Sequence, residues 1–305
     1  MALMDFAAGF GFSNLDMIYS GIDQLPREGE ETLAKDFNLC LGGGIPATMI
    51  NLSRLGVETK IGTFLGKDMF SQYVEQQFRE YGINYTNLYN GSKIPICIST
   101  SMVTPHDRTF MTYRQDIEPD DRLYDRIYSI LKGAKVVEMH FGFSEVYKRL
   151  KKEGVILVFD NGWDEQMSVE KYREYLETAD YYVPNKKEAL KITGTDSIEE
   201  AAKILSQFFS DVVIKLDRDG CYYYSRDTGR AVVIPSISKM HAIDSTGAGD
   251  AFLSGFIYGL MKGVDIQKCI LFGNVTGGAC VEGIGCLTSY VDEKELLIRA
   301  SSATV

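Results

Sequence analysis

The 305-residue sequence has no long apolar run and few of the residues that build metal or disulfide sites. No run approaches the roughly 20 apolar residues that cross a bilayer, and the N-terminus lacks the basic and apolar regions of a signal peptide. The six cysteines are scattered without a Cys-x-x-Cys pair, and His106, His140 and His241 lack ligand spacing. We therefore expect reduced, mostly buried thiols in a cytoplasmic protein, and no zinc site.

Two further absences exclude whole classes of function. Lys and Arg number 32 against 42 Asp and Glu, which gives a net charge of −10. A general nucleic-acid binder is not expected, because affinity for a phosphate backbone needs a basic surface. The chain has no Gly-x-x-x-x-Gly-Lys-Ser/Thr and no protein-kinase motif set, and Gly9-Phe-Gly11 lacks the third glycine of a dinucleotide fingerprint. P-loop kinases and protein kinases are thereby excluded.

The stretch with the most chemical content is 244–255, Asp-Ser-Thr-Gly-Ala-Gly-Asp-Ala-Phe-Leu-Ser-Gly, followed by apolar residues at helical spacing. Small residues let the backbone approach a ligand, and a helix that begins here directs free N–H groups and its positive dipole end at an anion such as phosphate. Asp250 would repel a resting anion, so its best explanation is removal of the proton from a hydroxyl that attacks phosphorus. The alternative is a tight turn in which Asp250 only caps the helix.

This stretch closely resembles the second signature, Asp-Thr-x-Gly-Ala-Gly-Asp, of the ribokinase-like (PfkB) carbohydrate kinases, with Ser245 as the one variation. The resemblance implies that Asp250 is the catalytic base and that the Gly-Ala-Gly backbone forms an anion hole. It also implies that the first residue of the signature contacts the cofactor. The residues concerned are Asp244, Gly247, Ala248, Gly249 and Asp250.

A second glycine-rich stretch, Gly42-Gly43-Gly44, leads into a predicted helix over 47–55 that ends at Gly56. It resembles the first signature of the same family, and Asn14-Leu-Asp16 resembles the family's Asn-x-Asp, whose aspartate holds substrate hydroxyls. The alternatives are a plain glycine turn and ordinary turn chemistry. One departure is Ala47, which stands where the family usually has a sugar-binding asparagine. The expected substrate contacts are Asn14, Asp16, Gly42, Gly43 and Arg108.

Asn185-Lys-Lys-Glu188 has the spacing of a capping box at the start of a helix. The family carries Asn-x-x-Glu here, near the magnesium–phosphate end of the site, and the two roles are compatible. Lys215 lies near the end of a strand predicted over 211–216, where it either places a positive charge by the γ-phosphate or is a surface lysine. The resemblance implies ATP and Mg²⁺, and it allows a monovalent cation beside the anion loop. The expected cofactor contacts are Asn185, Glu188, Lys215, Gly220, Asp244 and Asn274, of which Asn185 and Glu188 also serve the metal.

From residue 120 onwards predicted helices and strands alternate, which indicates a parallel sheet covered on both faces. Residues 17–39 and the hairpin 94–113 instead indicate exposed strands. The resemblance implies one α/β domain over 1–305, a ribokinase-like three-layer sandwich with a mainly parallel central sheet. A small β-sheet lid over the sugar site would be inserted at about 14–39 and 93–115. Exposed lid strands often pair between subunits, so a homodimer through the lid is an expectation.

The sequence therefore predicts an ATP-dependent kinase that phosphorylates a hydroxyl of a sugar or sugar derivative. Two alternatives stay open: a nucleoside kinase of the same fold, and a non-catalytic sugar-binding sensor. The complete Gly-Ala-Gly and Asp250 argue against the sensor. No nucleic-acid or membrane partner is expected.

Overall fold

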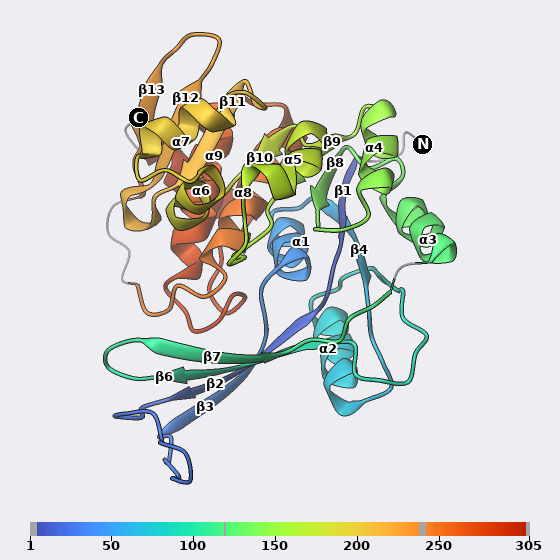
Figure 1. The fold of residues 1–305 in the computed structure, drawn as a ribbon, viewed down its shortest axis with the longest axis vertical. Helices are drawn as coiled ribbons and strands as arrows, with labels where there is room; N and C mark the ends of the chain where they lie inside the picture. Colours follow the sequence, from blue (N-terminus) through green and yellow to red (C-terminus); the bar gives the residue numbers. More distant parts are fainter. Residues whose placement is uncertain (1–4, 119, 238–241, 303–305) are drawn as a thin grey trace.

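A six-stranded parallel sheet, in the order β10-β9-β8-β1-β4-β5, lies at the centre of the molecule (Figure 1). In this computed structural model, which describes residues 5–118, 120–237 and 242–302, the strands are β1 (Phe6–Phe10), β4 (Glu58–Thr63), β5 (Tyr85–Asn87), β8 (Val136–Met139), β9 (Ile156–Phe159) and β10 (Tyr181–Tyr182). The predicted parallel sheet is confirmed. His241 lies outside the described residues.

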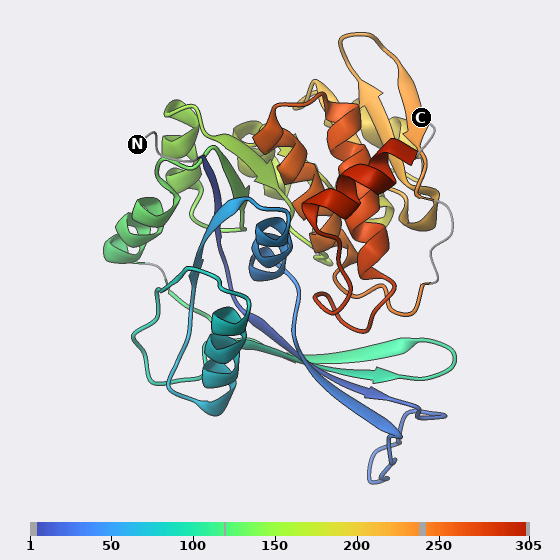
Figure 2. The same cartoon turned by 180° about the vertical axis from the view of Figure 1, so that it is seen from behind.

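The sheet separates two hydrophobic cores, because successive side chains of a strand point to opposite faces. In β1, Ala7 belongs to the first core, whereas Ala8 and Phe10 belong to the second. Helices cover both faces, which makes the predicted three-layer sandwich (Figures 1 and 2). The helices of the first core are α1 (Ile45–Arg54), α2 (Met69–Glu80), α8 (Ala248–Lys262), α9 (Ile266–Cys280) and α10 (Glu293–Ser302), and those of the second are α3 (Asp121–Leu131), α4 (Ser144–Lys152), α5 (Val169–Thr178), α6 (Lys186–Thr193) and α7 (Ile198–Leu205).

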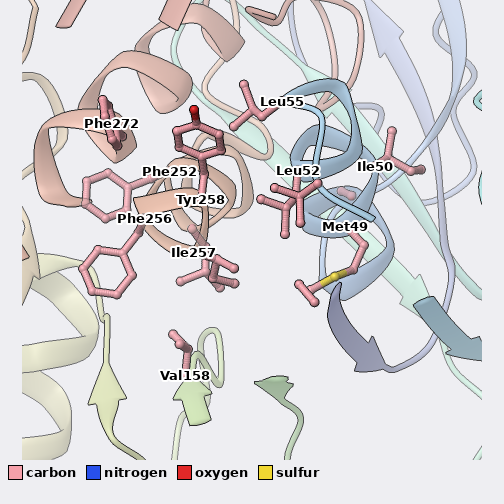
Figure 3. Close-up of a cluster of buried hydrophobic side chains, with 14 of the residues drawn as sticks. Met49, Ile50, Leu52, Leu55, Val158, Phe252, Phe256, Ile257, Tyr258 and Phe272 are labelled. Carbon is pink, nitrogen blue, oxygen red and sulfur yellow. The ribbon is translucent and has the colours of Figure 1, made fainter. Parts of the chain in front are cut away.

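Helix α8 packs against α1 on one side and α9 on the other. Figure 3 shows Met49 and Leu52 of α1 pointing toward Ile257 of α8, all of them in the first core. On the other side, a methyl group at Gly255 would overlap the α9 backbone, so glycine permits this close approach. The helix glycines of 265–281, which predicted close approach to a ligand or another helix, include Gly273, which lies against an α8 ring. The start of α1 and the start of α8 are therefore fixed by one core.

A separate four-stranded sheet projects from the main body (Figure 1) and is here called the lid sheet. Its strands, in the order β3-β2-β6-β7, are β2 (Asn14–Ser20), β3 (Asp36–Leu41), β6 (Cys97–Val103) and β7 (Arg108–Tyr113). The hairpin predicted over 94–113 is confirmed by the antiparallel pairing of β6 with β7. β2 follows β1 after a short turn, so the lid sheet begins at the carboxyl end of the central sheet, where α/β folds bind ligands. Phe37, Phe110 and Tyr113 are exposed on it, and pairing between subunits stays a prediction.

A third sheet departs from the alternating pattern. β11 (Asp211–Lys215), β12 (Cys221–Ser225) and β13 (Ala231–Ile234) pair antiparallel, and one parallel bridge from Asn185 to Lys215 connects this sheet to the chain after β10. β13 was not predicted, because Ala231-Val-Val-Ile234 is a run of only four residues without alternation. Among the helices of the described ranges, none is long and apolar enough to cross a bilayer.

Candidate active site

The two glycine-rich stretches meet at the carboxylate of Asp250, in the first turn of α8. A methyl group at Gly43 would overlap Oδ2 of Asp250, so a side chain at this position would push the carboxylate aside. The backbone N–H of Gly44 lies near the same carboxylate and favours its charged form. The residues before α1 and the first turn of α8 thus touch each other, although they are about 200 positions apart in the sequence.

Polar side chains of β2 lie beside these glycines. The side-chain amide of Asn14 donates to the Gly43 carbonyl at 3.1 Å, and the Gly42 N–H donates to the Asn14 carbonyl at 2.7 Å. A methyl group at Gly42 would lie 2.7 Å from Oδ2 of Asp16. The structure therefore brings together Asn14, Asp16, Gly42 and Gly43, here called the substrate face, and places Asp250 next to it. Hydroxyl groups suit this surface, because it offers both acceptors and an amide.

Both carboxylates at the substrate face bind protons more tightly than an ordinary aspartate. Burial, and then the charge of Asp244, raises the pKa of Asp16 to about 6. Burial also raises the pKa of Asp250 to about 6; the Gly44 N–H opposes this shift and the charge of Asp160 adds to it. A general base works best when its pKa lies near the operating pH, so Asp250 is suited to accept a proton.

The start of α8 offers backbone donors to an anion. Gly247 is the N-cap residue of α8 and has a φ of 75°. A side chain at this position would overlap Cys286, which packs directly against it. The N–H of Ala248 donates to Ser245, whereas the N–H groups of Gly249 and Asp250 have no acceptor in the described parts of the chain. Residues 247–249, here called the phosphate cradle, therefore combine free N–H groups with the positive end of the helix dipole.

A buried lysine lies beside the phosphate cradle. Lys215 is only 9% exposed, and a methyl group at Gly249 would be 3.4 Å from its Nζ atom. The ammonium pairs with Oδ2 of Asp160 at 2.9 Å. Burial lowers the pKa of Lys215, but Asp160 and Glu188 outweigh that effect and raise it above its ordinary value. The surface-lysine alternative is wrong, and the residue keeps a positive charge where phosphate is expected.

Asn185 and Glu188 form the predicted capping box at the start of α6. The Asn185 side chain accepts from the Glu188 N–H at 3.0 Å, and the Asn185 N–H donates to Oε2 of Glu188 at 2.8 Å. Burial, and then the charge of Asp160, raises the pKa of Glu188 to about 7. Within the described ranges no three potential ligands cluster as a metal site. Mg²⁺ usually keeps several waters and uses only one or two carboxylates plus phosphates, so Asp160 and Glu188 beside the cradle fit this ion.

Two residues expected at the nucleotide converge on the end of β13. Asn274 donates from its side-chain amide to the carbonyls of Ile234 and Pro235, at 3.1 and 3.0 Å. Gly220 has a φ of 97°, and the backbone of 234–236 occupies the space that a side chain would take. Both residues therefore hold the same backbone segment. Their contact with a nucleotide stays a prediction.

Arg108, expected at the substrate, contacts the start of the Asp250 motif instead of the substrate face. Its guanidinium donates to Oδ1 of Asp244 at 3.2 Å, to the Thr246 hydroxyl at 2.8 Å and to the Ser245 hydroxyl at 3.2 Å. The sequence did not predict this contact, because its partners lie more than 130 positions apart. Whether Arg108 also touches a substrate stays a prediction.

Glu138 is a buried carboxyl group that the sequence reading overlooked as part of the site. It is 3% exposed on β8, and its Oε1 accepts from the Thr48 hydroxyl at 3.4 Å. Its Oε2 has no partner among the described residues. Burial, and then the charges of Asp250 and Asp160, raises its pKa well above the ordinary value. The sequence did contain an indication of this role, because Glu138 is the one acid in the apolar strand Val-Val-Glu-Met. All four residues of this strand are buried, and buried glutamates are rare.

Replacing Glu138 by glutamine is expected to stabilise the protein at neutral pH. Its folded-state pKa lies above the unfolded one, so stability falls as pH rises through this window, and glutamine removes that loss. We expect the Glu138→Gln variant to be more stable than the wild type at pH 8 and nearly unchanged in stability at pH 4. Urea unfolding at both pH values measures the difference, with Glu165→Gln on the surface as control. An equal change at both pH values would contradict a neutral Glu138.

Known proteins resemble this chain over most of its length. A sequence model described as pfkB family carbohydrate kinase matches residues 15–293. The 5-dehydro-2-deoxygluconokinase of Clostridium perfringens is 29% identical over 83% of this chain and 81% of its own length. A nucleoside kinase of Methanocaldococcus jannaschii is 25% identical over 92% of this chain and 91% of its own. The structure of Arabidopsis thaliana ribokinase, complexed with ribose and ATP, has the same fold, with a TM-score of 0.81 and 22% identity over 98% of this chain and 99% of that one.

Proposed function

Because the chain belongs to the pfkB family of carbohydrate kinases, we propose that it transfers the γ-phosphoryl group of ATP to a hydroxyl of a sugar or sugar derivative, with Asp250 as the general base. One observation carries this proposal. The Asp250 carboxylate lies against Gly43 of the substrate face and, in the same turn of helix, adjoins the phosphate cradle. A hydroxyl bound there would lie between a proton acceptor and the phosphorus that it attacks.

The reaction uses these groups in a simple order. Asn14 and Asp16 hold substrate hydroxyls, and the hydroxyl nearest Asp250 gives up its proton to that carboxylate. The oxygen then attacks the γ-phosphorus, and the bond from phosphorus to the bridging oxygen of ADP breaks. Backbone N–H groups of the cradle and the Lys215 ammonium stabilise negative charge on the transferring group.

The residues proposed to bind ATP and Mg²⁺ are already connected by an ion pair and a capping box. Asp160 and Glu188 would hold Mg²⁺, partly through water, and Asn185 orients Glu188 through the capping box. Magnesium held there would supply positive charge that offsets the negative charge of the ATP phosphates. Lys215 links this group to the cradle through its ion pair with Asp160. Gly220, Asp244 and Asn274 complete the proposed nucleotide side, and a monovalent cation near the cradle stays a prediction.

The substrate is identified by measuring ATP consumption with a panel of candidate acceptor compounds. The relatives include a 5-dehydro-2-deoxygluconokinase and a nucleoside kinase, so the panel needs simple sugars, sugar acids, amino-sugar adducts and nucleosides. Turnover with sugars or sugar acids supports the proposal, and turnover with nucleosides alone favours the alternative. No turnover with any compound would favour a non-catalytic sensor.

The pH dependence of kcat/KM for the sugar provides a further test. Asp250 accepts a proton only when it is ionised, and its pKa of about 6 means that it becomes protonated as pH falls through that value. We expect kcat/KM to fall about tenfold per pH unit below pH 6 at saturating ATP. Asp16→Asn removes a negative charge that raises the Asp250 pKa, so this variant should shift the acid limb to lower pH. A wild-type midpoint near pH 4, that of an ordinary aspartate, would rule out the raised pKa.

A further inference from the structure

We propose that Arg108 is a positioning residue that couples the lid sheet to the shape of the phosphate cradle, an inference that rests on the proposed kinase function. Arg108 is the first residue of β7, directly after the hairpin turn 104–107. Its side chain leaves the lid sheet and makes three hydrogen bonds to residues 244–246. The next residue, Gly247, begins the cradle.

On the lid side of this contact, hydrogen bonds within the hairpin turn hold the backbone at Arg108. Thr104 donates to the Asp107 carbonyl from its N–H at 3.0 Å and from its hydroxyl at 2.9 Å. The N–H of Arg108 donates to the Asp107 side chain at 2.8 Å, and Arg108 pairs with Val103 across the hairpin. These bonds fix the base of the Arg108 side chain. A movement of the hairpin would therefore carry the guanidinium with it.

The receiving side is also tightly bonded. Oδ1 of Asp244 accepts from the Thr246 N–H at 2.9 Å and from its hydroxyl at 2.8 Å, while Oδ2 accepts from the Gly285 N–H at 2.9 Å. These bonds fold residues 244–246 into a turn around one carboxylate. The Asp244 side chain is 17% exposed, so an unpaired charge there would be costly. Arg108 supplies the opposite charge and a planar set of donors, a combination that lysine cannot reproduce.

The Arg108 contact would link sugar binding at the lid sheet to phosphoryl transfer at the cradle. Asn14 and Asp16 lie on β2 of the same lid sheet, so a bound sugar would fix that sheet in place. Through Arg108 the sheet would then hold residues 244–246, and with them the N–H groups of the cradle. Phosphoryl transfer would be favoured when the sugar is present, and ATP would be protected from water.

Two Arg108 variants and one control separate coupling from simple packing. Arg108→Ala removes all three bonds, Arg108→Lys keeps only the charge, and His106→Ala changes an exposed side chain on the same turn. With the best panel substrate, we expect Arg108→Ala to lower kcat/KM for ATP by about 10- to 100-fold. We also expect it to raise the share of ATP lost to water several-fold. Arg108→Lys should fall in between, and His106→Ala should match the wild type.

Hydrogen exchange of the ligand-free protein tests the contact without any turnover. Amides of β6 and β7 should exchange faster in Arg108→Ala than in the wild type or His106→Ala. Unchanged exchange would overturn the contact, and faster exchange with an unchanged share of ATP lost to water would overturn the coupling. If the wild type phosphorylates no panel compound, the proposed function fails, whereas the exchange comparison still decides whether Arg108 fastens the lid sheet.

Discussion

Replacing Asp250 by asparagine is expected to lower kcat by about 10³-fold or more while leaving the fold intact. Asparagine has nearly the same shape and still presents an oxygen to the Gly44 N–H, but it cannot take a proton from the attacking hydroxyl. The two glycine-rich stretches should therefore stay together, and only the chemical step should be lost. The measurement is single-turnover phosphoryl transfer with the best panel substrate, together with the circular dichroism spectrum.

Stability provides an independent check on the same variant. The folded-state pKa of Asp250 is about 6, above its ordinary value of 3.8, so ionised Asp250 costs stability as pH rises through this window. Asp250→Asn should therefore be more stable than the wild type at pH 8, by about 3 kcal/mol for a pKa raised from 3.8 to about 6. Asp227→Asn, in an exposed turn, is the control and should change neither property. Near-normal turnover in Asp250→Asn would remove Asp250 as the base.

Replacing Gly43 by alanine is expected to lower kcat by about 10²-fold. The added methyl group would overlap the Asp250 carboxylate and would push it away from the substrate face. The Gly43 backbone does not have a positive φ, so alanine is tolerated there apart from this contact. The loss should consequently appear in turnover far more than in the melting temperature. Steady-state kinetics and thermal unfolding of the variant measure both.

A double-mutant cycle shows whether Gly43 acts through Asp250. If displacement of the carboxylate is the cause, Gly43→Ala should cost little more once Asp250 is already asparagine. Equal losses in both backgrounds would mean that the methyl group disturbs substrate binding in another way. In that case the close contact between the two residues would have no role in catalysis.

The sequence predicted those parts of the site whose chemistry is local. Asp250 follows small residues at the start of a helix, and Gly42 and Gly43 precede another helix, so each motif has its own physical explanation. That these two motifs lie next to each other in the fold followed only from the family resemblance, since neither motif contains information about the other. The parallel sheet and its covering helices were readable for a similar reason, because hydrophobic periodicity is a property of short windows.

The remaining features depend on contacts between distant segments. Nothing near Lys215 in the sequence shows that it is buried beside Asp160 and the cradle. The raised pKa of Glu138 follows from its burial and from the charges of Asp250 and Asp160, which lie on other segments of the chain. The guanidinium of Arg108 finds its partners in a segment that is distant in the sequence. The antiparallel arrangement of β11, β12 and β13 comes from strand pairing, which hydrophobic periodicity does not specify.

Helices α1 and α8 share one core, whereas the proposed substrate contacts Asn14 and Asp16 lie on the lid sheet. The distance over which the phosphoryl group moves and the choice of substrate would therefore depend on different parts of the chain. In the proposed reaction, the spacing between the acceptor hydroxyl and the transferred phosphorus would depend on side chains such as Leu52 and Ile257, which lie in the core of the molecule. The lid sheet contributes only a few residues to that core, among them Leu15 and Leu41. Substitutions there could consequently alter which molecule is accepted without disturbing the catalytic distance, so new specificities could evolve at little cost in folding stability.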